Sequence, residues 1–308
     1  MSSPSANEIK FWHRGHGRLE TELVYGEGFI RYLYQNDWGK RLNRWLASAW
    51  ASKAYGVVQD LPVSHRKVRP FIEKFGVNID EYERGTRSSL DAKDSYASFN
   101  EFFVRRFRMG KRPFVHEPHR MPAFAEARYV GHAQVGPETV FPVKGVHLGV
   151  GDLLGNQDVA RPFLGGPLLI ARLCPVDYHR FHYPDTGKVI DQWRVKGRYD
   201  SVNPVALRNK PDIFIANERH VTLIQTENFG RIAYIEVGAV CVGKIVQTHR
   251  WNKPFLRGEE KGYFLFGGST VVVLGEPGAW RPSADILAKT SEGIETYLRL
   301  GEEVAVKG

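Results

Sequence analysis

The sequence has little cysteine and no long apolar run. Its two cysteines, Cys174 and Cys241, have no Cys or His neighbours at metal-ligand spacing, so we expect buried reduced thiols rather than a zinc site or a disulfide framework. No apolar stretch approaches the roughly 20 residues that a membrane-spanning helix needs. The first 20 residues are polar and do not resemble a signal peptide. We therefore expect a protein on the cytoplasmic side, without a transmembrane helix.

Acidic residues are fewer than basic ones, which leaves a formal net charge of +9. Such a balance favours an acidic partner: nucleic acid, an anionic membrane surface or an acidic substrate. Hydrophobic residues make up 42% of the chain and charged residues 25%, as in soluble globular proteins. Composition alone does not choose among the three partners.

The first third of the chain is predicted to be helical and basic. Between residues 28 and 56, apolar residues recur at helical spacing among lysines and arginines: Trp38, Leu42, Trp45, Leu46, Ala49 and Trp50. This pattern fits either a helix packed on the core with a solvated basic face, or an interfacial helix on anionic lipid. Residues 99–108, FNEFFVRRFR, interleave Phe and Arg at helical spacing, but no base-reading signature accompanies them, so we expect no nucleic-acid partner.

From Pro122 onward, short runs rich in Val, Ile and Leu alternate with turn residues and predict strands. These runs are GPLLIARL (166–173), HVTLIQT (220–226), RIAYIEVGAVCVG (231–243) and STVVVLG (269–275). The segment 283–300 is predicted to be the last helix. The fold class is therefore α+β, with a helical region at 1–113, which faces a membrane if its tryptophan-rich helix is interfacial, and a β-rich domain, barrel-like or sandwich-like, at 114–308.

His179 and His182 lie three residues apart in RLCPVDYHRFH (172–182). No third ligand follows at a familiar spacing and no HExxH pattern exists, so we expect no metal and favour acid–base chemistry. The alternative is a pair of structural histidines in a polar cluster.

Gly267-Gly268-Ser269 lacks the lysine of a phosphate-binding loop, and a strand rather than a helix follows it. The two glycines leave the Gly268 carbonyl open to close approach by the Ser269 hydroxyl, although an ordinary glycine-rich turn would have the same sequence. The small residues of VGAVCVGK (237–244) fit close backbone approach to a ligand or to another strand. Glu126, in PAFAEARYVG, is by itself an unremarkable acid.

Taken in order, these segments resemble the motifs of the phosphatidylserine decarboxylases. The similar segments are FNEFFVRRF with KRP, CPVDYHRFHYPDTG, KGRYDSVNP, ENFG, EVGAVCVG, EKGYFLFGGSTVVVL and ETYLRLGEEV. The resemblance runs from about Tyr25 to the C-terminus and is strongest for the branch whose cleavage site reads GGST.

The resemblance implies a proenzyme that cuts itself between Gly268 and Ser269 into chains 1–268 and 269–308, which stay together as a heterodimer. Ser269 becomes a covalent pyruvoyl group, the cofactor, which forms a Schiff base with the substrate amine. His182 is the expected base for cutting and His179 the expected proton donor during decarboxylation. The expected substrate is phosphatidylserine in an anionic membrane, where the enzyme is peripheral.

Two positions depart from the family pattern. The family aspartate that orients the base falls at Glu126 when counted from Arg112-Pro113; an alternative alignment through 121–123 places Phe124 there instead. Lys244 stands where relatives carry Ser, at a position near the substrate end in the family. The resemblance implies that Lys244, Gly243 and Tyr178 bind substrate. A pyruvoyl decarboxylase of a soluble amino acid, an uncut lipid-binding protein on the same fold, and a homodimer all remain open.

Overall fold

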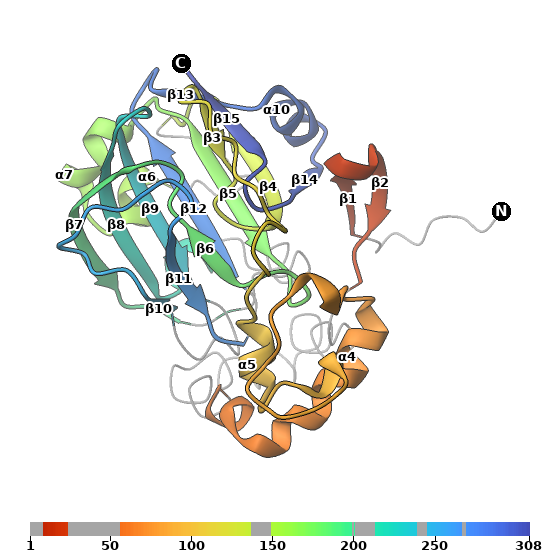
Figure 1. Ribbon diagram of the computed structural model, residues 1–308. Coiled ribbons are helices and arrows are strands. Elements are labelled where there is room, and N and C mark those ends of the chain that lie inside the picture. The colour runs from red at the N-terminus through yellow and green to blue at the C-terminus, as the bar shows by residue number, and fades with distance from the viewer. Residues whose placement is uncertain are drawn as a thin grey trace, which may run out of the picture.

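The computed structural model describes residues 9–23, 56–136, 149–198, 200, 213–238, 245–266 and 269–308. Within these ranges, nine strands form one open, mixed sheet (Figure 1). Their order across the sheet is β2 (Arg18–Thr21), β1 (Lys10–His13), β14 (Glu295–Leu298), β4 (Ala127–His132), β5 (Leu168–Leu173), β12 (Ser269–Gly275), β9 (Arg231–Val237), β8 (Arg219–Thr226) and β7 (Gly187–Val195). Neighbouring strands are antiparallel except β1 and β14, which are parallel.

Burial along the strands explains their places in the sheet. All seven residues of β12 and all six of β5 are buried, as expected for central strands with continuous apolar runs. In β7, at one edge, exposed and partly buried residues mix along the strand. The main hydrophobic core gathers around the central strands, and Val271, Val273 and Leu274 of β12 belong to it. Ser269 is therefore the first residue of the most deeply enclosed strand.

Two smaller sheets complete the β structure. One consists of β10 (Ile245–Gln247), β11 (Glu260–Phe264) and β6 (Arg180–His182), and the other of β13 (Trp280–Pro282), β15 (Glu303–Lys307) and β3 (Arg120–Pro122). The first matters for the site, because β6 carries His182 and β11 leads into Ser269.

The helices are few and short in the described ranges. They are α4 (Val68–Phe75), α5 (Phe99–Phe103), α6 (Val150–Leu154), α7 (Gln157–Ala160), α9 (Ile213–Ala216) and α10 (Ala284–Ser291), with 3-10 turns at Arg14–His16, Pro62–Lys67, Ile79–Glu81, Ala92–Asp94 and Arg161–Phe163. In Figure 1, α4 and α5 lie together at one end of the sheets. They share a second core, here called the lobe core, which also takes in Tyr178 and Phe266 from the site segments. A membrane-spanning helix needs about 20 apolar residues, and the described part of the chain contains no helix of that kind.

The α+β prediction and the four predicted strand runs are confirmed, but the barrel-like prediction is wrong because the large sheet is open. Within the predicted helical region 1–113, residues 10–21 form a β-hairpin that joins this sheet through the parallel pairing of β1 with β14. Most of the predicted tryptophan-rich helix, 28–56, lies outside the described residues, and the division into regions 1–113 and 114–308 stays a prediction.

Two predicted helices are shorter than expected. In segment 283–300 the helix ends at Ser291; Gly293 then takes a left-handed φ of 72°, and β14 follows between β1 and β4. In segment 99–108 the helix ends at Phe103, because the following chain pairs with residues 81–83. There the Glu83 amide donates to the Arg106 carbonyl at 2.8 Å, and the Arg108 amide donates to the Glu81 carbonyl at 2.9 Å. Tertiary pairing overrides helical periodicity at both places.

Candidate active site

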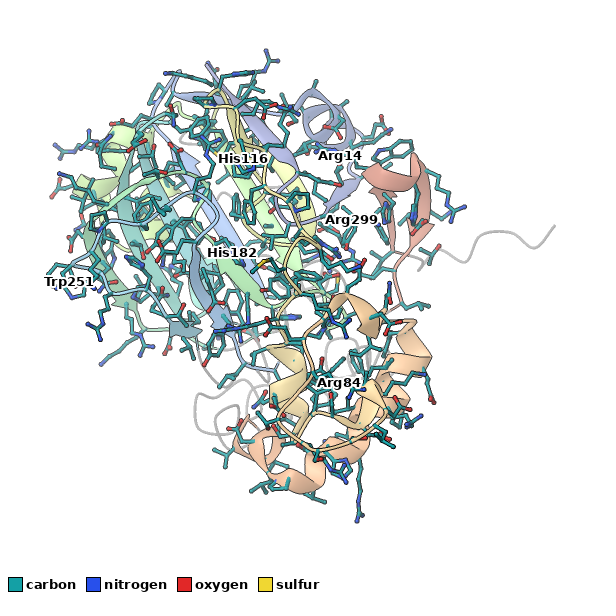
Figure 2. All side chains as sticks on the ribbon, viewed as in Figure 1. Arg14, Arg84, His116, His182, Trp251 and Arg299 are labelled. Carbon is teal, nitrogen blue, oxygen red and sulfur yellow. The ribbon has the colours of Figure 1, made fainter. Side chains whose placement is uncertain are left out.

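Backbone pairing brings the two histidines and Ser269 to one region. The last strand before Ser269 is β11, which pairs with β6, and the Phe264 amide donates to the His179 carbonyl at 2.9 Å. Ser269 itself pairs with Leu173, the last residue of β5, and residues 174–179, here called the histidine loop, follow directly. The region lies between the sheets and the helices α4 and α5, where Figure 2 shows His182 near the centre of the molecule.

Ser269 is completely buried, and its hydroxyl has no hydrogen-bond partner among the described residues. A buried hydroxyl without a partner costs about 1–3 kcal/mol, so such groups in folded proteins call for an explanation. An oxygen that must be free to attack provides one. Gly267 and Gly268, including the predicted scissile carbonyl, lie outside the described residues.

His179 is also completely buried, and its orientation is set by the histidine loop. Its Nδ1 lies 3.0 Å from the Asp177 carbonyl; because a carbonyl only accepts, Nδ1 carries the proton and Nε2 has the free lone pair. This Nε2 has no partner in the described chain, and the ring packs on Phe103 with centroids 3.8 Å apart. Burial, together with the positive charge of Arg105, lowers the pKa of His179 from 6.5 to about 3.

His182 has the same tautomer by a different contact. Its Nδ1 donates to the Gly258 carbonyl at 2.9 Å, and its Nε2 is likewise buried without a partner among the described residues. Burial lowers its pKa to about 4, although the Gly258 hydrogen bond and the charge of Glu260 act in the opposite direction. Both histidines are therefore neutral at pH 7, each with an Nε2 that can accept a proton.

Tyr178, predicted to bind substrate, is buried in the lobe core between two aromatic rings. Its ring centroid lies 4.3 Å from that of Phe107 and 6.0 Å from that of His182. Burial raises the pKa of its hydroxyl above the usual 10. The other two predicted substrate contacts, Gly243 and Lys244, lie outside the described residues.

Glu126 is buried close to the site, but its described hydrogen bonds lead elsewhere. The Arg112 guanidinium binds its carboxylate through two nitrogens at 2.5 and 3.0 Å, and the Tyr297 hydroxyl and Leu300 amide also donate to it. The link to the site runs through the backbone, because the His182 amide donates to the Phe124 carbonyl at 2.8 Å. The Nδ1 acceptor of His182 is thus the Gly258 carbonyl, whereas the sequence suggested Glu126.

Three groups of the site are not apparent from the sequence: the backbone carbonyls of Asp177 and Gly258, which accept from the two imidazoles, and the guanidinium of Arg105, whose charge acts on His179. A carbonyl has no sequence signature. Arg105 stands among several arginines of one segment, and only burial distinguishes it: Arg105 is 2% exposed, whereas Arg106 and Arg108 are exposed.

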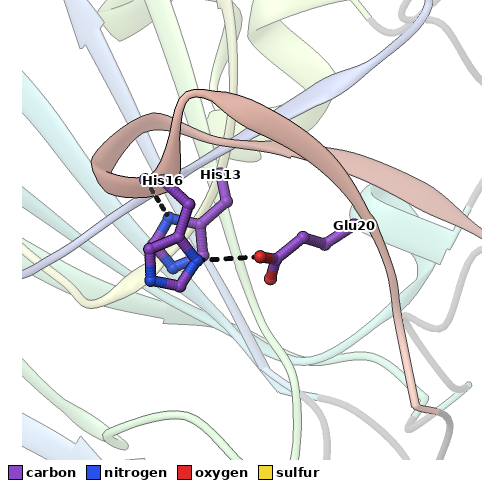
Figure 3. A group of neighbouring side chains, drawn as sticks. All are labelled: His13, His16 and Glu20. Carbon is purple, nitrogen blue, oxygen red and sulfur yellow. Dashed lines mark hydrogen bonds and ion pairs between the residues drawn. The ribbon is translucent and has the colours of Figure 1, made fainter.

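A separate group of possible metal ligands, His13, His16 and Glu20, lies on the β1–β2 hairpin, with one ligand atom from each within 4.8 Å of the others (Figure 3). The two imidazole rings are stacked, with centroids 3.7 Å apart and planes 11° apart. Imidazole lone pairs lie in the ring plane, so two stacked rings cannot both direct a nitrogen at one ion about 2.0–2.1 Å away. The His13 Nδ1 lone pair also accepts the His16 amide at 3.2 Å. This group does not have the arrangement of a metal site.

Comparison with known proteins agrees with this geometry. Residues 99–306 match the family model described as "Phosphatidylserine decarboxylase". The chain is 34% identical to the phosphatidylserine decarboxylase proenzyme of Clostridium botulinum (strain Hall) over 300 residues, covering 97% of this chain and 99% of that protein. It is 35% identical to the proenzymes of Clostridium kluyveri and Desulfitobacterium hafniense, covering 97% of this chain and 99% and 98% of theirs. The chain belongs to the phosphatidylserine decarboxylase family.

Proposed function

We propose that this chain is a phosphatidylserine decarboxylase proenzyme, a carboxy-lyase that cuts itself between Gly268 and Ser269 and converts phosphatidylserine to phosphatidylethanolamine. The observation that carries the proposal is the group of buried, unpartnered atoms His179 Nε2, His182 Nε2 and Ser269 Oγ. Orphaned polar atoms lower stability, so their gathering on adjoining segments favours a catalytic role over a structural one.

We assign His182 as the base that takes the Ser269 proton. Accepting that proton creates an imidazolium, which a neighbouring anion stabilises and a neighbouring cation destabilises. On His182 the charge of Glu260 acts in the favourable direction and exceeds the opposing charge of Arg180, with which Glu260 pairs. On His179 the charge of Arg105 opposes protonation, and no anion among the described residues offsets it. His179 is then the group that takes a proton from the substrate ammonium on its free Nε2 and returns that proton to the substrate carbon after carbon dioxide has left. Glu126 is the carboxylate expected to assist His182 during cutting, after exchanging contacts with Arg112.

The surroundings of Ser269 fit a covalent pyruvoyl group at the new N-terminus. Residues 270–274 of β12 pair with both β5 and β9, so the strand that carries this terminus stays fixed after cutting. When present, the pyruvoyl carbonyl supplies an electrophile for the substrate amine and a sink for the electrons left by carbon dioxide. The same pairing keeps chain 269–308 inserted in the sheet of chain 1–268 as a heterodimer.

The substrate places the enzyme at an anionic membrane, as a peripheral protein on the cytoplasmic side. The net charge of +9 supports this proposal, since basic proteins are attracted to anionic lipid. The tryptophan-rich segment 28–56 is the proposed contact, and Tyr178, Gly243 and Lys244 are the proposed substrate contacts near the reacting centre.

Intact mass spectrometry of the purified protein tests the proposal. We expect two chains divided at Gly268/Ser269, with the small chain lighter by one ammonia than the plain 269–308 peptide. Ser269→Ala is the control and should give one full-length mass. Carbon dioxide release should then be much faster with phosphatidylserine vesicles than with free serine. One full-length mass for the parent chain would contradict the proposal, and equal turnover of free amino acids would exclude the lipid substrate.

A further inference from the structure

Arg105 is a buried arginine beside the site without an acidic partner among the described residues. It follows the end of α5, and its guanidinium lies over the rings of Tyr82 at 4.4 Å and Phe102 at 4.7 Å. A buried charge is costly unless other groups compensate it. The compensation here comes from aromatic faces and backbone carbonyls rather than from a carboxylate, so a net positive charge remains next to the histidine loop.

The Arg105 guanidinium forms hydrogen bonds with the backbone of the histidine loop. Its Nη2 donates to the Val176 carbonyl at 2.8 Å and to the Asp177 carbonyl at 3.1 Å. The Asp177 carbonyl is the same atom that accepts Nδ1–H of His179. The Asp177 carboxylate is held from the other side by Arg128 at 2.6 Å and by the Cys174 amide at 2.6 Å. Asp177, whose carbonyl orients His179, is thus held through both its carbonyl and its carboxylate.

We propose that Arg105 is a positioning residue of the decarboxylase, which holds the Asp177 carbonyl in place so that His179 keeps its proton on Nδ1 and presents Nε2 to the substrate. This proposal rests on the proposed function of His179. Without the guanidinium, the Asp177 carbonyl loses the donor that fixes its direction, which weakens the contact that selects the His179 tautomer.

The charge of Arg105 has a second effect on the same histidine. It disfavours the imidazolium, and an imidazolium that forms in spite of it is a strong proton donor to a carbanion. The other neighbours of His179 do not replace this effect. Phe103 and the adjoining Phe266 are apolar, and the Asp177 carboxylate is already bound by Arg128. Arg105 is therefore the group whose removal should change both the tautomer and the acidity of His179.

The first measurement needs no catalysis. In the uncut Ser269→Ala chain, nitrogen-15 NMR of the imidazoles reports the tautomer and pKa of His179, assigned by its absence in a His179→Asn variant. Arg105→Met should raise the His179 pKa by about one unit or more and mix the two tautomers. Arg105→Lys keeps the charge, so the pKa should stay low while the tautomer preference weakens. Arg108→Met, an exposed arginine that binds the Tyr82 carbonyl instead, is the matched control and should change neither.

The second measurement is turnover by the processed enzyme. Arg105→Met should lower kcat about tenfold or more while KM changes by less than about twofold. In the plot of kcat against pH, the acid limb should move to higher pH, because the pKa of His179 rises. Arg105→Lys should recover part of the loss. An unchanged His179 tautomer and pKa in Arg105→Met would overturn the proposal, as would a changed His179 with unchanged turnover. Failure of the parent chain to cut itself would instead count against the proposed function.

Discussion

Self-cleavage should continue at a pH that would protonate an ordinary histidine. The proposed base, His182, is buried and its pKa is lowered to about 4. At pH 5.5 a base with that pKa is almost wholly neutral, whereas a histidine with the usual pKa near 6.5 is only about one-tenth neutral. The first-order rate of cutting should therefore be nearly flat from pH 8 to about 5 and fall to half near pH 4. If the base were exposed to solvent, the rate of cutting at pH 5.5 would be roughly tenfold lower than at pH 8.

The assay follows the disappearance of full-length chain. The protein is made by cell-free translation at neutral pH, transferred to buffers between pH 4 and 8, and sampled on gels that separate chains 1–268 and 269–308. His179→Asn should cut with the same pH profile, and His182→Asn should cut far more slowly at every pH. A midpoint near 6.5 in the parent chain would refute the argument from burial. Cutting by His182→Asn at the parent rate would refute the assignment of the base.

Three further predictions concern the carboxylates and histidines of the interior. Glu126→Ala should slow cutting by about a hundredfold or more, with Glu126→Asp as the conservative control; cutting at the parent rate would exclude Glu126 as the assisting carboxylate. In the uncut Ser269→Ala chain, Glu22→Gln should cost about 3–5 kcal/mol in urea unfolding, because Glu22 pairs with two buried arginines. The control Glu20→Gln, on the exposed hairpin, should lower the free energy of unfolding by about 1 kcal/mol or less. Equal losses of unfolding free energy in the two variants would contradict the prediction. In the unfolded chain, His179 and His182 bind protons near pH 6.5, whereas in the folded chain they do so only near their lowered pKa values. The free energy of unfolding should therefore fall as the pH drops from about 6.5 to about 4, by roughly 1.4 kcal/mol per pH unit for each of the two histidines. An unfolding free energy that does not change over this range would mean that the two histidines are not neutral in the folded chain.

The local sequence pattern is sufficient to predict the buried strands and the family motifs, because both depend on residues that are neighbours in the chain. The apolar runs that become β5, β8, β9 and β12 were recognisable because a buried strand needs a continuous apolar segment wherever it sits in the sheet. The ordered motifs around His179, His182 and Ser269 were likewise sufficient to indicate the family, since the chemistry requires those residue types.

Periodicity failed where partners distant in sequence decided the structure. Residues 295–298 follow a helix and share its pattern, yet they form β14 because β1 and β4 lie on both sides of them. The chain after Phe103 leaves the helix because residues 81–83 offer backbone hydrogen bonds. The open sheet, with the N-terminal hairpin at one edge, depends on these same distant pairings, and no local signal distinguishes it from a barrel.

The sequence by itself determined which residues can carry the chemistry: the serine, the two histidines and a nearby acid. Only the tertiary structure decided their electrostatics and contacts. Burial makes both imidazoles neutral, backbone carbonyls of Asp177 and Gly258 select their tautomers, and Glu126 is held by Arg112. The physical reason is that pKa values and hydrogen-bond partners depend on desolvation and on groups from remote segments, which the folded chain brings together and the order of residues does not display.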